Sequence, residues 1–350
     1  MDLTQKRWIW ISIGFSVVVL VIVLASTLDQ NTLEYLKQAN PIFLILAVGL
    51  RLCSLLFWSL RVKMMSHALG YRIKLSNAWN LVLANLLIGA ITPGQAGGEP
   101  VRIHELYKDG VKIGDASAIV IMERVLDGLI LVLMGVLSIG LLGSVVPGIS
   151  ITLIIAMIIS WIFMGGLIIL LFMASRNPEK VKLMIIRLLH WLDAKIHRAS
   201  LKKTIGRVDA ELDNFFVSIN LFTGPARRGL VTGGFFSLLF WISEFFVASL
   251  ILMGLGLSPY ILESFLFQLI IAVVMMLPLT PGSSGIAEIS ATSLYALIVP
   301  SSLLGIFVLL WRLILYYLNI ALGLWPSLTI FRRELARKDD ESGQDPKSEG

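Results

Sequence analysis

Charged side chains occur in an apolar stretch of this sequence, where few are expected. The segment MERVLDGL carries Glu123, Arg124 and Asp127 between two runs of aliphatic residues, and Arg312 lies within another apolar run. A guanidinium group presents a planar set of donors that can bind a phosphate group through two parallel hydrogen bonds. These residue types therefore favour a site for an anionic, phosphate-bearing group.

Two loops rich in helix-breaking residues accompany these charges. The first reads TPGQAGGEP at positions 92–100 and the second reads TPGSSGIAE at 280–288. Glycine permits tight turns and close backbone approach, and the helix N-terminus that follows such a turn attracts anions. We expect the site to be lined by the four charged residues above and by loop residues Glu99, Arg102, Glu288, Gly94, Gly97, Gly98, Gly282 and Gly285.

The elements that position these residues must be membrane helices. Hydrophobic residues make up 57% of the chain and charged residues 15%, against about 45–50% and about 25% in soluble domains. A helix needs about 20 apolar residues to cross a bilayer. We expect an all-α polytopic membrane protein with about seven transmembrane helices, and the long apolar ranges are 8–28, 41–60, 116–142, 151–174, 230–255 and 303–325.

The distribution of basic residues predicts the orientation, because lysine and arginine accumulate in cytoplasmic loops. Bases gather before residue 8, at 61–74, at 102–112, at 176–228 and after 331. We therefore expect both termini in the cytoplasm, with 8–28 as an uncleaved anchor. The shorter apolar stretches 78–91 and 265–279 run into the two loops, and we expect each to form a re-entrant helical hairpin, one from each face of the membrane.

We expect a single integral membrane domain over residues 1–331, followed by a disordered cytoplasmic tail at 332–350. The segment 175–228 is expected to be cytoplasmic and amphipathic, since apolar residues recur at helical spacing over 181–192. We place this helix on the membrane surface. Docking of a partner protein is the alternative.

An offset of 188 residues relates the two loops and their surroundings. The first repeat spans 41–145 and the second 229–327, and the matched residues are Thr92 with Thr280, Gly97 with Gly285, Leu106 with Leu294, Tyr107 with Tyr295 and Arg124 with Arg312. Because the charge pattern gives the two copies opposite orientations, we expect an inverted repeat. Broken helices of inverted repeats build the midplane sites of many secondary transporters. Chance similarity, or breakers that merely kink buried helices, are the alternatives.

Buried charges need partners, since each costs at least about 2.5–3.5 kcal/mol near the bilayer centre. On a helix, residues 123, 124 and 127 fall within an arc of about 100°, so one interpretation is a structural network among those three. Arg312 has no acid on its own span. Its candidate partners are Glu244, Glu99, Glu288 or an anionic substrate, and Arg51 is expected to snorkel or to pair in a similar way.

These residues resemble the lysylphosphatidylglycerol synthase transmembrane (flippase) domain family and its free-standing flippase-like members. The resemblance covers nearly the whole chain and rests on TPGQAGGEPVR, on the later ER and D, and on PLTPGSSGIAE. It implies a protein of the cytoplasmic (inner) membrane that moves a lipid between leaflets. The matching positions are Glu99, Arg102, Glu123, Arg124, Asp127, Gly285 and Glu288. Bifunctional relatives carry a soluble aminoacyl transferase domain after the membrane part, whereas only a short tail follows the last expected span here, so the resemblance does not imply synthase activity or an aminoacylated lipid as substrate.

The sequence thus predicts a lipid flippase-like transporter for a phospholipid or a polyprenyl-phosphate-linked lipid. One alternative is an ion-coupled small-solute transporter in which Glu123, Asp127 or Glu288 carries protons. Another is a non-catalytic partner of a lipid-modifying or glycosylation complex, and a homo-oligomer is possible. We expect no enzyme activity, because Ser283 and Ser284 have no histidine in the same spans to act as base. No cofactor motif, metal-ligand spacing or nucleic-acid-binding motif is present in the sequence.

Overall fold

The computed structural model describes residues 39–90, 97–145, 201–275 and 283–343, together with Lys37, Thr92 and individual positions between 155 and 187. Every secondary-structure element in these ranges is helical, so the all-α class is confirmed for them. The predicted span 8–28 lies outside the described residues, as do Gly94 and Gly282 in the two loops. Of the predicted span 151–174, only single positions are described, and all of those are helical.

Two long antiparallel helices occupy the centre of the fold. α3 (Pro41–Ala68) begins after Asn40, whose side chain accepts a hydrogen bond from the N–H of Ile42 and so caps the helix. The backbone N–H of Asn40 also donates to the carbonyl of Gly254, the last residue of α10 (Arg227–Gly254), at 2.8 Å. Within the described part of the chain, α3, α10 and the continuous segment Ser301–Ile330 are long and apolar enough to cross a membrane.

The helices around this central pair repeat in the same order. The first half consists of α3, α4 (Leu75–Ala90), α5 (Gly98–Lys108) and α6 (Ile113–Val145); the second consists of α10, α11 (Ile261–Met275), α12 (Ile286–Tyr295) and a continuous segment formed by α13 (Ser301–Arg312), η1 (Leu313–Tyr317) and α14 (Leu318–Gly343). Corresponding helices begin 186, 186, 188 and 188 residues apart. This near-constant spacing supports the duplication that the sequence offset predicts.

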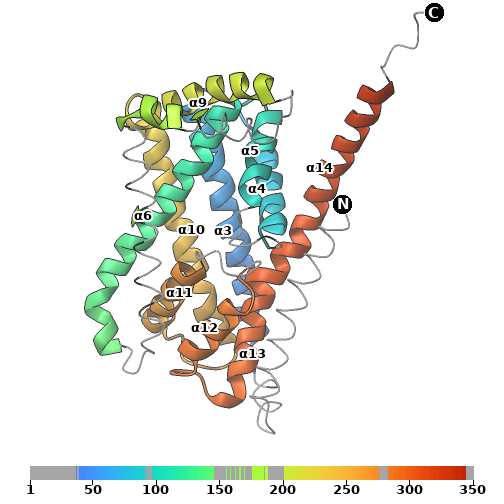
Figure 1. Cartoon of the computed structure of the whole chain (residues 1–350). Helices are drawn as coiled ribbons and strands as arrows, with labels where there is room; N and C mark the ends of the chain where they lie inside the picture. Colours follow the sequence, from blue (N-terminus) through green and yellow to red (C-terminus); the bar gives the residue numbers. More distant parts are fainter. Residues whose placement is uncertain are drawn as a thin grey trace, which may run out of the picture.

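The two halves point in opposite directions. Figure 1 shows α4 and α5 near the end where α3 finishes, and α11 and α12 near the end where α10 finishes. Packing is exchanged between the halves, because α4 lies against α14 while α11 lies against α6. Each helix that precedes a break is therefore supported by the last long helix of the other half.

α9 (Leu201–Thr223) lies across one end of the bundle (Figure 1). Its Glu211 carboxylate accepts a hydrogen bond from the N–H of Gly114 at 2.7 Å, and the Ser218 hydroxyl donates to Asp115 at 2.5 Å. A side chain at Gly114 would collide with the α9 backbone, since its Cβ would lie 2.3 Å from the Glu211 carbonyl oxygen. α9 is thus fixed to the start of α6.

Several boundaries differ from the expectation. The span expected at 41–60 continues to Ala68, because apolar residues go on recurring at helical spacing past the basic residues. The tail expected to be disordered from 332 is helical as far as Gly343. Of the amphipathic stretch at 181–192, most of 181–187 is described and helical, and the remainder is outside the described residues. The expected number of about seven spans stays a prediction, because the ranges 8–28 and 151–174 lie wholly or mostly outside the described residues.

Replacing Gly323 with valine should separate α14 from α4. A Cβ at Gly323 would lie 2.6 Å from the carbonyl oxygen of Leu83 and 2.8 Å from the Cβ of Leu87. Forced overpacking of this kind costs about 1–3 kcal/mol or more. We expect a fall of several degrees in the thermal unfolding midpoint of the detergent-purified protein. Gly49→Val is the matched control, because no atom lies within 4 Å of a Cβ there; equal midpoints for the two variants would contradict the packing argument.

Alkaline titration tests how much Tyr71 stabilises the end of the bundle that α9 covers. Burial, together with the hydrogen bond that its hydroxyl donates to Asp115, raises the pKa of Tyr71 to about 12. A raised folded-state pKa gives stabilisation that is present below the ordinary tyrosine pKa of about 10 and is lost as pH rises through about 12. The unfolding midpoint should therefore fall across this window, and should fall less in Tyr71→Phe. The exposed Tyr107 provides the control, since the unfolding midpoint of Tyr107→Phe should fall with pH as steeply as that of the wild type.

Candidate functional site

Two carboxylates of α6 face an arginine of α3 in the interior of the first half. The Nε of Arg61 lies 2.7 Å from Oε1 of Glu123, and its Nη1 lies 2.6 Å from Oδ1 of Asp127. Two residues of α10 complete the shell: Nη1 of Arg61 also donates to the hydroxyl of Ser237 at 2.6 Å, and the indole N–H of Trp241 donates to Asp127 at 3.1 Å. All three charged side chains are buried.

A second arginine closes this arrangement. Arg102 of α5 forms an ion pair with the other carboxylate oxygen of Glu123. The guanidinium carbons of Arg61 and Arg102 lie 5.6 and 5.3 Å from the ring centroid of Trp58, which stabilises both cations through its π face. We call Arg61, Arg102, Glu123 and Asp127 the buried charge cluster. Its two positive and two negative charges cancel, which is the condition under which burial of charge is tolerated.

Arg124 does not belong to this cluster, contrary to the network that joined it to Glu123 and Asp127. Its Nε donates to Oε1 of Glu99, in the first turn of α5, at 2.7 Å. The reason is angular. Successive helical residues point about 100° apart, whereas residues four apart differ by only about 40°, so Glu123 and Asp127 share a direction toward α3 while Arg124 faces α5.

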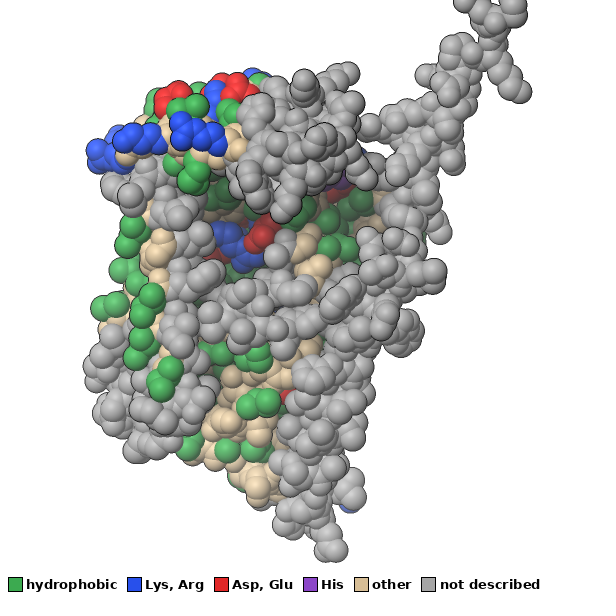
Figure 2. All heavy atoms as spheres, in the orientation of Figure 1, with side chains coloured by type: hydrophobic (Ala, Val, Ile, Leu, Met, Phe, Trp, Pro, Cys, Tyr) green, Lys and Arg blue, Asp and Glu red, His purple; other side chains and the backbone are tan. Residues whose placement is uncertain are grey.

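The Arg124–Glu99 pair is accessible, whereas the cluster is not. The side chain of Arg124 is 33% exposed and that of Glu99 is 31% exposed. Figure 2 shows a basic and an acidic group side by side in a recess of one face, with some apolar side chains nearby. A polar group held in apolar surroundings beside a recess can meet a ligand that approaches from the surface.

The second half contains the equivalent pair. Nε of Arg312 donates to Oε1 of Glu288 at 2.7 Å, which matches the contact of the first pair, and Nη2 of Arg312 lies at 2.7 Å from the same oxygen. The partners are 24 residues apart in the second half and 25 in the first. In each half a glutamate in the first turn of the helix after the break binds an arginine of the following long helix. Arg312 and Glu288 are buried, with side chains 2% and 0% exposed.

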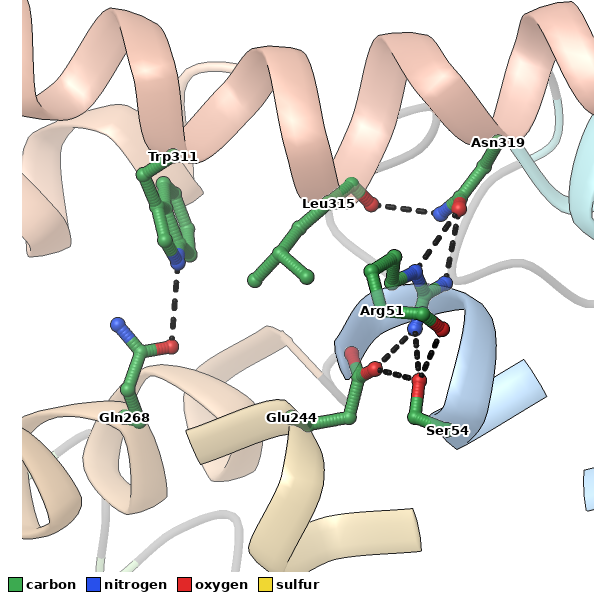
Figure 3. A network of polar contacts seen from close by, with 7 residues as sticks. All are labelled: Arg51, Ser54, Glu244, Gln268, Trp311, Leu315 and Asn319. Atoms are coloured by element: carbon green, nitrogen blue, oxygen red, sulfur yellow. Dashed lines mark hydrogen bonds and ion pairs between the residues drawn. The ribbon is translucent and has the colours of Figure 1, made fainter. Parts of the chain in front are cut away.

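Of the predicted partners of Arg312, the structure therefore selects Glu288. Glu244 binds Arg51 instead (Figure 3). The same Arg51 guanidinium donates to Oδ1 of Asn319 at 3.0 and 2.9 Å and to the hydroxyl of Ser54 at 3.1 Å. Of the two expectations for Arg51, snorkelling or pairing, the structure shows pairing, and these contacts join α3 and α10 to α14.

Glycines at the breaks have the backbone roles that the loops predict. Gly97 and Gly285 occupy the position before α5 and α12, and they correspond at the 188-residue offset. Gly285 has a φ of +82° and the neighbouring Ser283 a φ of +54°, a region that favours glycine. A side chain at Gly98 would lie 2.3 Å from Oδ1 of Asn85. Close helix approach therefore requires glycine there.

The arrangement brings the predicted residues together in two groups, one in each half. The first group contains Arg124 and Glu99, which lie on α6 and α5, the helices that also carry residues of the buried charge cluster. The second group contains Arg312 of α13 and Glu288 of α12. Sequence reasoning missed Arg61, which it assigned to a cytoplasmic loop. A signal was available, because two acids within an apolar span require positive partners that a single adjacent arginine cannot supply.

Long apolar helices with arginine–carboxylate pairs buried between them define an all-helical, multi-pass membrane protein. The chain belongs to the family described by the lysylphosphatidylglycerol synthase TM region, whose family model matches residues 9–323. The family predicted from the two loops and the ER and D residues is thereby confirmed.

Proteins of similar sequence are archaeal membrane proteins. A UPF0104 membrane protein of Archaeoglobus fulgidus is 35% identical over 316 residues, which cover 89% of this chain and 94% of that protein. The corresponding protein of Methanocaldococcus jannaschii is 28% identical over 312 residues, covering 88% and 90%. That of Pyrococcus horikoshii is 23% identical over 328 residues, covering 91% and 96%. No solved structure matches the chain.

Proposed function

We propose that this protein is a lipid flippase-like transporter that moves an anionic or phosphate-bearing lipid between the leaflets of the cytoplasmic membrane. The observation that carries the proposal is the repeated arginine–glutamate pair. Arg124–Glu99 and Arg312–Glu288 share an Nε–Oε1 contact of 2.7 Å, each beside a helix break, in two halves that point in opposite directions. A headgroup can be bound by the same chemistry from either side.

The chemistry of the pair suits a phosphate ester. A guanidinium has five N–H donors, and the contact between Arg124 and Glu99 uses only the Nε of Arg124. The two terminal nitrogens form the fork that binds two phosphate oxygens. A phosphate bound through this fork can leave the Nε contact with Glu99 in place, so neither Arg124 nor Glu99 loses its partner in a medium where that is costly.

The surroundings suit the acyl or prenyl chains of such a lipid. Exposed aliphatic and aromatic side chains cover the outer faces of α3 and α10, among them Ile45, Leu52, Val231 and Phe235. A headgroup in the recess (Figure 2) can leave its chains on such surfaces, since apolar groups lose nothing by contact with lipid. In this proposal α4–α5 and α11–α12 are re-entrant hairpins from opposite faces, and α9 and both termini are cytoplasmic.

Reconstitution tests the proposal directly. Purified protein in liposomes should make fluorescently labelled phosphatidylglycerol, or a labelled polyprenyl phosphate, accessible to a membrane-impermeant quencher from the opposite leaflet. Labelled phosphatidylcholine reports whether an anionic headgroup is required. Arg228→Ala, which removes an exposed base at the start of α10, should behave as wild type. Rates equal to those of protein-free liposomes for every lipid would overturn the proposal, and proton-dependent uptake of a water-soluble compound would replace it with ion-coupled solute transport.

A further inference from the structure

One tyrosine touches both helix breaks and the second arginine. Tyr316 lies four residues after Arg312, and its ring centroid is 4.4 Å from the guanidinium carbon of that arginine. Its hydroxyl donates to the carbonyl of Ala90 at 3.2 Å and accepts from the hydroxyl of Ser284 at 3.5 Å. Ala90 is the last residue of α4, before the first break, and Ser284 precedes α12, after the second break. The side chain of Tyr316 therefore bridges the two halves.

The backbone that carries Tyr316 is itself unusual. Residues Leu313–Tyr317 form a π-helix, a rare conformation that occurs often at functional sites. The side-chain amide of Asn319 donates to the carbonyl of Leu315 at 2.6 Å within this turn, while its oxygen accepts from Arg51 (Figure 3). The π-helical turn is thus connected to α3 through Asn319 and Arg51. Through Tyr316 it is connected to Ala90 and Ser284.

The two arginine pairs differ in exposure although both contain the same Nε–Oε1 contact. In the first half the side chains are 33% and 31% exposed, and in the second half 2% and 0%. In this structure the first pair is therefore accessible and the second is buried. Tyr316 covers Arg312 and ties it to the end of α4.

We propose that Tyr316 is a positioning residue that closes the second arginine pair, and that release of its hydroxyl from Ala90 opens this pair while the first one closes. The inference rests on the proposed function, because it has the two arginine pairs bind the same phosphate-bearing headgroup one after the other. Opening requires loss of two buried hydrogen bonds, each equivalent to roughly a threefold change in an equilibrium constant within a membrane protein.

Cysteine accessibility in the full-length reconstituted protein tests the inference. Cys53 is the single native cysteine, so Cys53→Ser gives a cysteine-free background. Two reporters are placed at matched positions, four residues after each glutamate: Ile103→Cys on α5 and Thr292→Cys on α12. In the presence of Tyr316→Phe, labelling of Thr292→Cys by a maleimide should rise roughly three- to tenfold, and labelling of Ile103→Cys should fall.

The reciprocal change separates positioning from simple loosening, which would raise labelling at both reporters. Tyr107→Phe, which removes an exposed hydroxyl, should leave both rates unchanged. Unchanged labelling at Thr292→Cys, or a rise at both sites, would overturn the inference. Should Tyr316→Phe yield no folded protein, Ser284→Ala removes one of the two hydrogen bonds and must raise Thr292→Cys labelling roughly threefold for the inference to stand. Labelling needs no lipid movement, so absence of flipping by the wild type would refute the proposed function alone.

Discussion

Replacement of Arg124 by alanine should reduce lipid movement by at least about 30-fold while leaving the protein folded. The contact that matters for transport is the one between Arg124 and a bound phosphate. Removing one partner of such a charged hydrogen-bonded contact costs about 2–5 kcal/mol when the contact is desolvated, and a factor of ten in rate corresponds to about 1.4 kcal/mol. The effect on stability should be small, because Arg124 and Glu99 are each about one third exposed and such pairs contribute at most about 1 kcal/mol. Initial rates in liposomes and unfolding midpoints in detergent measure the two effects.

Arg124→Lys is the informative companion of this variant. Lysine keeps the charge but lacks the planar fork, so an intermediate rate is expected if two phosphate oxygens are bound together. Arg312→Ala should also stop transport, but it should lower stability as well, since Glu288 would remain buried without its arginine. Wild-type transport by Arg124→Ala, measured beside Arg228→Ala, would remove the first pair from the proposed pathway.

Replacement of Glu123 by alanine should destabilise the protein more than any other single carboxylate change discussed here. Glu123 contacts both arginines of the buried charge cluster, so its loss leaves Arg61 and Arg102 facing Asp127 alone. Breaking a buried ion pair by removing one partner costs about 3–5 kcal/mol. We expect a steep drop in folded yield and in the unfolding midpoint of whatever protein is recovered.

Glu99→Ala is the matched control for this prediction. It also removes a glutamate from an arginine pair, but from the accessible one, and it should change the midpoint little. Glu123→Gln keeps the shape of the side chain and removes only the charge, so it should remain clearly less stable than Glu99→Ala. Similar midpoints for the Glu123 and Glu99 variants would show that the cluster is less important for folding than its burial indicates.

Much of the architecture follows from composition and spacing. Hydropathy predicts the central helices, and the Thr92–Thr280 offset predicts the equal spacing of the helices in the two halves. Charge sorting, however, placed Arg61 in a cytoplasmic loop, because the rule that assigns bases to such loops has no means of recognising a base with a buried acid as its partner. Pairing depends on which helix faces which, and this information is not contained in the spacing along a single helix.

The candidate site, like the fold, could be predicted from the sequence only in part. The residue types that could bind an anion, and the equivalence of Arg124 with Arg312, are visible in the sequence. Selection of Glu99 and Glu288 as their partners required the placement of α5 against α6 and of α12 against α13. The π-helical turn after Arg312 has no signature in the sequence, so the contacts of Tyr316 with Ala90 and Ser284 could not be predicted.

The exchanged packing of α4 with α14 and of α11 with α6 has a consequence for biosynthesis. The helix that ends at Ala90 has its main support in a segment that begins at Leu318, which is translated after the whole of the first half. We therefore expect the first half to be incompletely packed until α14 has been synthesised. Truncations that remove only α14 should consequently expose the amino-terminal half to membrane proteases.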